Sequence, residues 1–140
     1  MRRKRVPGLA GALTTGLALT LPVLPAGPAA AASPAAAPGS SLTLTITPDQ
    51  PSGSGPRTTV TLECDPPGGT HPRPKEACAT LTAADGYFER IAPGSAGCTG
   101  LWAPVTVTAD GTWRAREVSF TERYSNRGCA AAATGGVFRF

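Results

Sequence analysis

The sequence contains few of the residues on which enzyme active sites are built. It has a single histidine among 140 residues, and aromatic residues make up only 6% of the chain. The nucleophile motif G-x-S-x-G, the zinc motif H-E-x-x-H and a glycine-rich phosphate loop are all missing. The one histidine, His71, lies in the stretch GTHP, where a lone histidine is more often a structural hydrogen-bonding residue than a general base. The sequence therefore argues against an enzyme.

The chain also lacks an unbroken apolar run of the length that spans a membrane. The basic cluster at residues 2–5 is followed by an apolar run, residues 8–24, which glycine and threonine interrupt, and then by small residues. This order predicts a signal peptide over residues 1–32, and hence a secreted, extracellular protein with no membrane partner in its mature form. We expect residues 33–41, rich in proline and alanine, to form a flexible arm, and residues 42–140 to form one domain.

An excess of charge is missing from the mature chain as well. Four of the 13 basic residues fall in the predicted signal peptide, so that nine basic residues balance nine acidic ones in the remainder. The sequence pI of about 9.2 therefore reflects the segment that is removed. The composition gives no support for a nucleic-acid partner.

Four cysteines lie downstream of the signal peptide. In an exported chain they predict two disulfides, with three possible pairings. Consecutive cysteines are 14, 20 and 31 residues apart, and no C-x2-C or C-x4-C pair occurs, so the spacing does not favour zinc. We expect no metal and no other cofactor.

The hydrophobic pattern predicts an α+β fold. Alternating apolar and polar residues predict strands at residues 41–48, 58–63, 105–108, 112–121 and 137–140. Helices are predicted at residues 75–84 and 126–133, and a short extended piece at residues 87–91. The Asp-Gly pair in Ala109–Gly111 predicts the turn of a hairpin, whereas residues 65–77 hold too many prolines and glycines for a strand.

An uncharged stretch surrounds the third cysteine. Residues 97–104 have the sequence GCTGLWAP, in which Cys98 stands three residues before the apolar pair Leu101–Trp102 and Pro104 ends the stretch. A tryptophan at the end of a loop either caps a core or contacts a partner, and the sequence leaves both roles open for Trp102.

The chain resembles the Streptomyces subtilisin inhibitor family from Leu42 to Phe140. The stretch CDPPGGTHPRPKEAC, Cys64–Cys78, is similar to a block of that family that contains G-T-H-P between two cysteines. Further matches follow in the family's order, at Ala79–Leu81, Cys98 with Pro104, Asp110–Trp113, Tyr124–Asn126, Cys129 and Val137–Phe140.

The resemblance implies a five-stranded antiparallel sheet with two short helices, and a homodimer. It also implies that Cys64 pairs with Cys78 and Cys98 with Cys129. Loops of 14 and 31 residues would each contribute about 3–4 kcal/mol in the chain-entropy model. Trp113 lies in the hairpin region that resembles the family's dimer surface, so that a dimer contact and burial in its own core are both open.

Family members inhibit serine proteases by presenting a substrate-like loop, and the resemblance implies a secreted inhibitor of a subtilisin-like protease. Their scissile bond follows the second residue after the third cysteine, which here makes Gly100 the P1 residue, on the amino side of the bond to Leu101. An asparagine that hydrogen-bonds the loop in the family corresponds to Asn126, and Cys129 would tether the loop through its disulfide. The implied binding loop also contains Gly97, Cys98, Thr99, Trp102, Ala103 and Pro104.

Glycine at P1 departs from the family's usual Met, Lys or Arg. The missing side chain and the flexibility of glycine would together cost about 2–4 kcal/mol, or about 30- to 1000-fold in affinity. Three hypotheses follow. The protein is a weakened subtilisin inhibitor that relies on Leu101 and Trp102, an inhibitor of a protease that accepts a small P1 residue, or a secreted non-inhibitory binding module that keeps the fold. The lack of a basic P1 residue disfavours a trypsin-like target.

Overall fold

The computed structural model of the protein describes residues 39–50, 55–94 and 97–140. The predicted signal peptide, residues 1–32, and most of the predicted arm lie outside the described residues. None of the helices in the described part of the chain is long and apolar enough to cross a bilayer.

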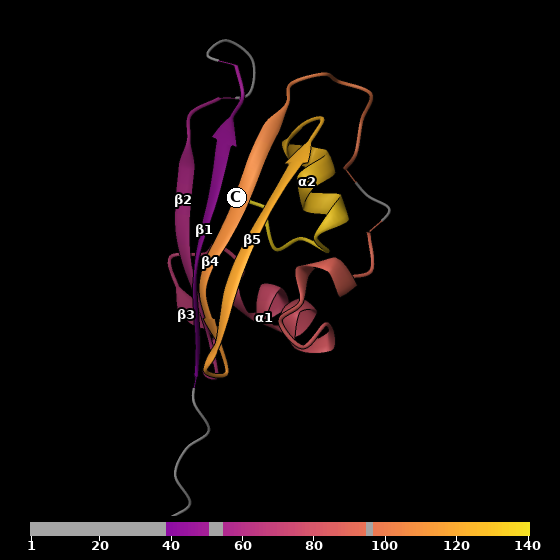
Figure 1. The fold of residues 1–140 in the computed structure, drawn as a ribbon. Coiled ribbons are helices and arrows are strands. Elements are labelled where there is room, and N and C mark those ends of the chain that lie inside the picture. The colour runs from indigo at the N-terminus through magenta and orange to yellow at the C-terminus, as the bar shows by residue number, and fades with distance from the viewer. Residues whose placement is uncertain (1–38, 51–54, 95–96) are drawn as a thin grey trace, which may run out of the picture. The chain divides into compact units, whose positions relative to one another are not determined.

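The described residues form a five-stranded antiparallel sheet in the order β3-β2-β1-β4-β5 (Figure 1). The strands are β1 (Ser40–Pro48), β2 (Thr58–Cys64), β3 (Gly68–Gly69), β4 (Val105–Trp113) and β5 (Arg116–Tyr124). The central strand β1 pairs with β2 on one side and β4 on the other. Its alternation of leucine or isoleucine with threonine places Leu42, Leu44 and Ile46 on the buried face.

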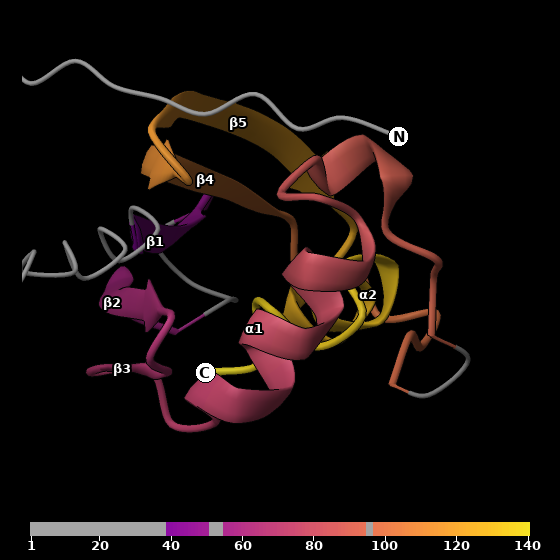
Figure 2. The ribbon, with the colours of Figure 1, turned by 90° about the horizontal axis from the view of Figure 1, so that it is seen from below.

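Helices α1 (Pro74–Ala83) and α2 (Arg127–Ala133) lie on the same face of the sheet (Figure 2). The short 3-10 helix η1 (Phe88–Arg90) follows α1 along the chain. The core between this layer and the sheet includes Phe88, stacked on Phe120 of β5 with 4.6 Å between ring centroids. Trp113 is buried in the same core, so its ring contributes to the fold of its own chain.

The hairpin turn predicted at Ala109–Gly111 is wrong, because β4 runs straight through this segment. Gly111 pairs with Leu42 of β1, and a Cβ at this glycine would lie only 2.2 Å from the carbonyl oxygen of Ser41. Glycine is therefore used here for close strand approach rather than for a turn. The turn is made by Arg114 and Ala115, whose φ angles of 46° and 67° are the positive values that a tight hairpin requires.

Two other local predictions are also wrong. Residues 87–91 contain the 3-10 helix η1 instead of an extended piece, and residues 137–140 form no strand. The chain turns after α2, where the Val137 amide donates to the Thr134 carbonyl. The fifth strand is instead β3, a two-residue strand inside the segment that contains too many glycines and prolines to predict one. The predicted strand number, both helices and both disulfide pairings are confirmed.

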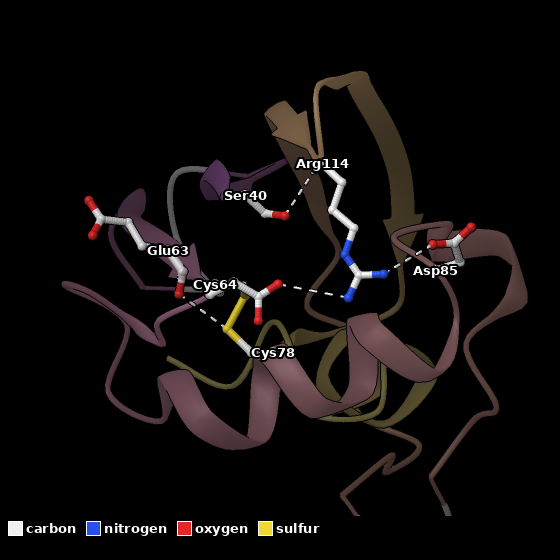
Figure 3. A network of polar contacts seen from close by, with 7 residues as sticks. Ser40, Glu63, Cys64, Cys78, Asp85 and Arg114 are labelled. Carbon is white, nitrogen blue, oxygen red and sulfur yellow. Dashed lines mark hydrogen bonds and ion pairs between the residues drawn. A yellow bond between two sulfur atoms is a disulfide. The ribbon is translucent and has the colours of Figure 1, made fainter. Parts of the chain in front are cut away.

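The Cys64–Cys78 disulfide joins the end of β2 to α1. Figure 3 shows it beside a polar network in which the Arg114 amide donates to Ser40 Oγ at 3.1 Å. The guanidinium of Arg114 lies 3.8 Å from Asp65 and 3.9 Å from Asp85, between the ends of β2 and α1. These ion pairs are solvent-exposed and add little to stability, so the disulfide and the core hold this end of the sheet.

His71 is buried in the loop that this disulfide closes. Its Nδ1 accepts a hydrogen bond from the Arg73 amide at 3.0 Å, and its Nε2 lies 2.9 Å from the Val137 carbonyl oxygen. The neutral ring with its proton on Nε2 satisfies both partners. The ring also meets Phe140 edge to face, with 5.7 Å between centroids. His71 thus ties the loop to the C-terminal segment, as a structural residue does.

Candidate functional site

The segment that enters β4, residues 97–104, lies on the surface beside the start of α2 (Figure 1). Leu101 is 64% exposed and Trp102 is 67% exposed, and among the described residues these are the large hydrophobic side chains that face solvent. Trp102 therefore does not cap the core. Exposing two adjacent apolar side chains is unfavourable for an isolated chain, and such a patch indicates a contact surface.

The amino-terminal half of the loop is fixed to α2 at two successive positions. The Cys98–Cys129 disulfide links it covalently to the first turn of the helix. One residue earlier, the carbonyl oxygen of Gly97 packs against Gly128, where an added Cβ would approach it to 2.0 Å. Gly128 therefore allows the loop backbone to lie directly on the helix, in the way that a glycine permits close backbone contact.

Asn126 connects the middle of the loop to the same helix. Its Oδ1 accepts a hydrogen bond from the Cys129 amide at 2.9 Å and so caps the helix. Its Nδ2 donates to the carbonyl oxygens of Thr99 at 3.1 Å and Leu101 at 2.8 Å. Because the cap needs an acceptor and both carbonyls need donors, only one orientation of the amide fits all three contacts.

The carboxyl-terminal half of the loop is held by backbone hydrogen bonds. The Ala103 amide donates to the Ser125 carbonyl oxygen at 2.8 Å, and the Asp49 amide donates to the Pro104 carbonyl oxygen at 3.0 Å. Val105 then begins β4, which is paired on both sides in the sheet. The loop is thus anchored at both ends, on one side to α2 and on the other to the sheet.

These contacts alternate along the chain. Backbone groups of residues 97, 99, 101 and 103 contact α2 or the two residues before it, so that every second residue of the loop is bound. A hollow of about 260 Å³, lined in part by Thr99, Leu101 and Asn126, lies between loop and helix. The loop is therefore held in place by a few specific contacts rather than by packing on a core.

Gly100 stands between the two carbonyls that Asn126 binds. A Cβ built on Gly100 would meet no atom within 4 Å, and its φ lies outside the positive range that disfavours side chains. Glycine is therefore not required here by the fold. The position is open to solvent and could carry any side chain.

A charged pair lies next to Trp102. The Arg123 guanidinium carbon lies 5.9 Å from the centroid of the Trp102 ring, and its Nε donates to Asp49 Oδ2. Asp49 also accepts a hydrogen bond from Thr106 Oγ1 at 2.8 Å. The Arg123 hydrogen bond, followed by that from Thr106, lowers the pKa of Asp49 below its ordinary value. Asp49 therefore remains an anion at neutral pH and holds Arg123 beside the ring.

Arg127, the first residue of α2, directly follows Asn126 in the chain. Its guanidinium donates to the Pro56 carbonyl oxygen and lies 3.4 Å from Thr58 Oγ1. Burial lowers the pKa of Arg127 from its ordinary value. These contacts tie the start of α2 to the start of β2, and so steady the helix end that holds the loop.

Residues 38–126 match the model of the family described as subtilisin inhibitor-like. The chain belongs to this family. Among its curated members, protease inhibitor SIL-V2 from Streptomyces orinoci is 43% identical over 68 residues, which cover 47% of this chain and 62% of that protein. The subtilase-type protease inhibitor of Streptomyces coelicolor is 39% identical over 137 residues, 92% of this chain and 95% of that protein.

Among solved structures, the chain is similar to Streptomyces caespitosus sermetstatin, whose crystal structure was determined in complex with Bacillus licheniformis subtilisin. The two chains share 32% sequence identity with a TM-score of 0.57, and the match covers 74% of this chain and 100% of the sermetstatin chain. The subtilisin inhibitor-like fold is therefore shared over the whole of that inhibitor.

The structure brings together most of the residues that the family resemblance named. Gly97, Cys98, Thr99, Leu101 and Ala103 all lie against the segment from Ser125 to Cys129.

The sequence did not single out Asp49, Arg123, Ser125 or Gly128 as site residues. A glycine one residue before a cysteine in a predicted helix was a weak sign of close backbone contact at Gly128. Asp49 and Arg123 lie 74 residues apart, and no local pattern joins them.

Proposed function

We propose that the protein is a secreted inhibitor of subtilisin-like serine proteases, that residues 97–104 are its protease-binding loop, and that Gly100–Leu101 is the reactive bond. The observation that carries this proposal is the Asn126 clamp. One amide group donates to the carbonyl of Thr99 on one side of Gly100 and to that of Leu101 on the other. A segment held in this way on both sides of one peptide bond is already fixed before a protease binds it.

The alternation of the loop supports the choice of bond. The carbonyls of Thr99 and Leu101 are bound by Asn126, whereas Gly100 between them is exposed. A catalytic serine could therefore approach the Gly100 carbonyl carbon without displacing the contacts beneath the loop. A peptide already fixed in this form avoids most of the ordering cost of about 1–2 kcal/mol per residue that a free peptide incurs.

The same contacts explain how a cut loop would inhibit instead of being released. After attack at Gly100, the acyl fragment stays attached through Cys98–Cys129 and the Thr99 hydrogen bond. The new amine of Leu101 stays in place through the Leu101 and Ala103 hydrogen bonds and the strand that follows. Because the amine remains beside the acyl-enzyme, rejoining the bond competes with hydrolysis. The protein itself then needs no catalytic group and acts as a ligand of the protease.

The proposal is tested by titrating subtilisin, an elastase-like protease and trypsin with the purified mature protein. We expect inhibition of subtilisin or the elastase-like enzyme, no inhibition of trypsin, and a single slow cut at Gly100–Leu101 in the mass spectrum. The control variant is Gly100→Met, whose side chain enters open space. It is expected to bind subtilisin about 30- to 1000-fold more tightly by filling the S1 pocket.

The outcomes separate the proposal from a non-inhibitory binding module. If wild type inhibits no protease while Gly100→Met inhibits subtilisin, the fold is an inhibitor scaffold and the wild-type protein is the binding module. If neither protein inhibits, or if the cut lies elsewhere, the assignment of residues 97–104 is wrong.

We further propose that two copies form a homodimer, as the family resemblance implies. The threonine-rich outer face of the sheet, opposite the two helices, is the surface left for this contact, and it lies away from the binding loop. Light scattering of the mature protein is expected to give twice the mass of one chain. A monomer at all concentrations would exclude this part of the proposal.

A further inference from the structure

The exposed side chains of the loop are distributed unevenly about Gly100. On its amino side, the positions other than the half-cystine Cys98 are Gly97 and Thr99, and Gly100 itself has no side chain. On the carboxyl side stand Leu101 and Trp102, each about two thirds exposed. Most of the apolar surface that the loop can bury against a partner therefore follows the Gly100–Leu101 bond. Burial of such surface is the main source of binding free energy.

Trp102 is an unusual anchor because its ring has no core beneath it. A side chain that rotates freely in the unbound protein lowers the binding affinity, because fixing it on binding costs about 0.5–1.5 kcal/mol. The guanidinium of Arg123 lies over the ring at 5.9 Å, within the range of a cation–π contact. Arg123 is itself fixed by Asp49, whose backbone amide holds the Pro104 carbonyl two residues after Trp102.

We propose that Arg123, held by Asp49, is a positioning residue that orders Trp102, and that the inhibitor recognises its protease mainly through the residues after the scissile bond. This inference rests on the proposed function. The target is then a serine protease whose S1 subsite accepts glycine and whose S1′ and S2′ subsites are apolar, so that they receive Leu101 and Trp102.

The chain offers a matched control for Arg123. Arg114 also lies over a tryptophan, with its guanidinium carbon 5.5 Å from the Trp113 ring, and it also faces carboxylates, those of Asp65 and Asp85. Trp113 is buried in the core, however, and Arg114 lies in the β4–β5 turn, whereas the loop adjoins the opposite ends of these strands (Figure 1). Arg114→Gln thus removes the same chemistry without touching the loop.

The experiment is a double-mutant cycle on the inhibition constant for the protease that wild type inhibits most tightly, subtilisin or the elastase-like enzyme, with wild type, Arg123→Gln, Trp102→Ala and the double variant. Trp102→Ala is expected to weaken inhibition about 30-fold or more. Arg123→Gln is expected to weaken it about 2- to 5-fold, the effect of an exposed cation–π contact. In the Trp102→Ala background Arg123→Gln should change nothing further, and Arg114→Gln should leave the constant unchanged.

A second readout needs no protease. Time-resolved fluorescence anisotropy of the free protein should show faster local motion of Trp102 in Arg123→Gln than in wild type, and Arg123→Lys should restore part of the order. The buried Trp113 gives the slow component in both proteins.

Three results would overturn the inference: an unchanged anisotropy, an equal effect of Arg123→Gln in both backgrounds, or a Trp102→Ala variant as tight as wild type. They differ from a failure of the proposed function. In that case the wild-type protein inhibits none of the three proteases, with or without inhibition by Gly100→Met, and the anisotropy still decides whether Arg123 orders the ring.

Discussion

Two segments of this molecule are closed by disulfides, and they serve opposite purposes. Cys64–Cys78 has both half-cystines buried, and the chain that it encloses turns inward to place His71 in the core. Cys98–Cys129 has one half-cystine exposed, and the loop that follows Cys98 carries its apolar side chains outward. The same covalent bond thus closes a buried segment at one site and anchors an exposed one at the other.

The difference lies in what the backbone contacts. In the first segment, side chains and backbone are used for packing and for hydrogen bonds within the core. In the second, backbone groups of residues 99, 101 and 103 are bound by Asn126 and Ser125, while Gly100, Leu101 and Trp102 are exposed. A peptide held in this way keeps its exposed residues available for a partner. The predictions below test this contrast, from the largest expected effect to the smallest.

Removing each disulfide separates the two roles. The double variants Cys64→Ala with Cys78→Ala and Cys98→Ala with Cys129→Ala should each lose about 3–4 kcal/mol of unfolding free energy, as measured in urea. Only the second pair should turn the protein into a substrate, because only there does the acyl fragment lose its tether. The protease titration is done under conditions in which both variants are folded. Wild-type inhibition by the second variant would contradict the contrast.

His71→Ala should affect stability alone. The substitution leaves the Arg73 amide and the Val137 carbonyl without partners in a buried site, and about 2–4 kcal/mol of unfolding free energy should be lost. Lys75→Ala, an exposed change in the same segment, should alter it by less than about 0.5 kcal/mol. Inhibition by folded His71→Ala should equal wild type. A loss of inhibition in this variant would show that the first segment also serves the binding site.

Replacements of Asn126 separate the helix cap from the clamp. Serine and aspartate both cap helices, but neither has the NH₂ group that donates to the Thr99 and Leu101 carbonyls together. Losing two hydrogen bonds, about 1–3 kcal/mol, should raise the hydrolysis rate of the bound loop about 5- to 150-fold in Asn126→Ser. Asn126→Asp should be cut faster still, because its carboxylate faces two carbonyl oxygens. A loop of Asn126→Ser that is cut no faster than wild type would exclude the clamp.

Gly128 and Gly94 form a matched pair of glycines at the contact between α2 and the chain before β4. Gly128 belongs to α2 and lies against Gly97, whereas Gly94 lies against Ala132 of α2. A Cβ at Gly128 would lie 2.0 Å from the Gly97 carbonyl oxygen, whereas one at Gly94 would lie 3.5 Å from that of Ala132. Gly128→Ala should displace the loop, cost about 1–3 kcal/mol in stability and weaken inhibition, while Gly94→Ala should do neither. Thermal unfolding and inhibition constants give both readouts. Equal behaviour of the two variants would mean that the contact at Gly128 is unimportant.

The smallest expected effect is the pH dependence of the Asp49–Arg123 pair. Because Arg123 lowers the pKa of Asp49 in the folded protein, the pair stabilises the fold above about pH 4, the ordinary value for aspartate. This contribution is lost as the pH falls through the lowered pKa. The difference in melting temperature between wild type and Asp49→Asn should therefore shrink on acidification. A difference that is independent of pH would contradict this.

The sequence predicted those parts of the fold whose signals are local and unopposed. Strand β1 alternates leucine with threonine, and α2 follows an asparagine cap, so each was placed within two residues of its bounds. At Asp110–Gly111 a strong local turn signal was overridden by tertiary structure, since Gly111 is needed where β4 approaches β1. The turn is instead formed by Arg114 and Ala115, which carry no such sequence signal.

The site was predicted only as far as the resemblance extended. The loop and its disulfide partner were named from the order of cysteines and from Pro104. The contacts that Asp49 and Arg123 make beside the loop could not be predicted from the sequence. They depend on the end of β1, the start of β4 and the end of β5 lying side by side in the sheet. Sheet register is a property of the whole fold, and a pair of turn and strand residues far apart in the sequence gives no sign of it.

The central claim is that the fold holds both sides of one peptide bond so firmly that cutting it is reversible. The most direct test mixes catalytic amounts of subtilisin with either intact protein or protein already cut at Gly100–Leu101, and follows both by mass spectrometry. The account predicts that the two mixtures converge on the same ratio of intact to cut chains, with intact protein re-formed from the cut form. Complete conversion to fragments from both starting points would contradict it.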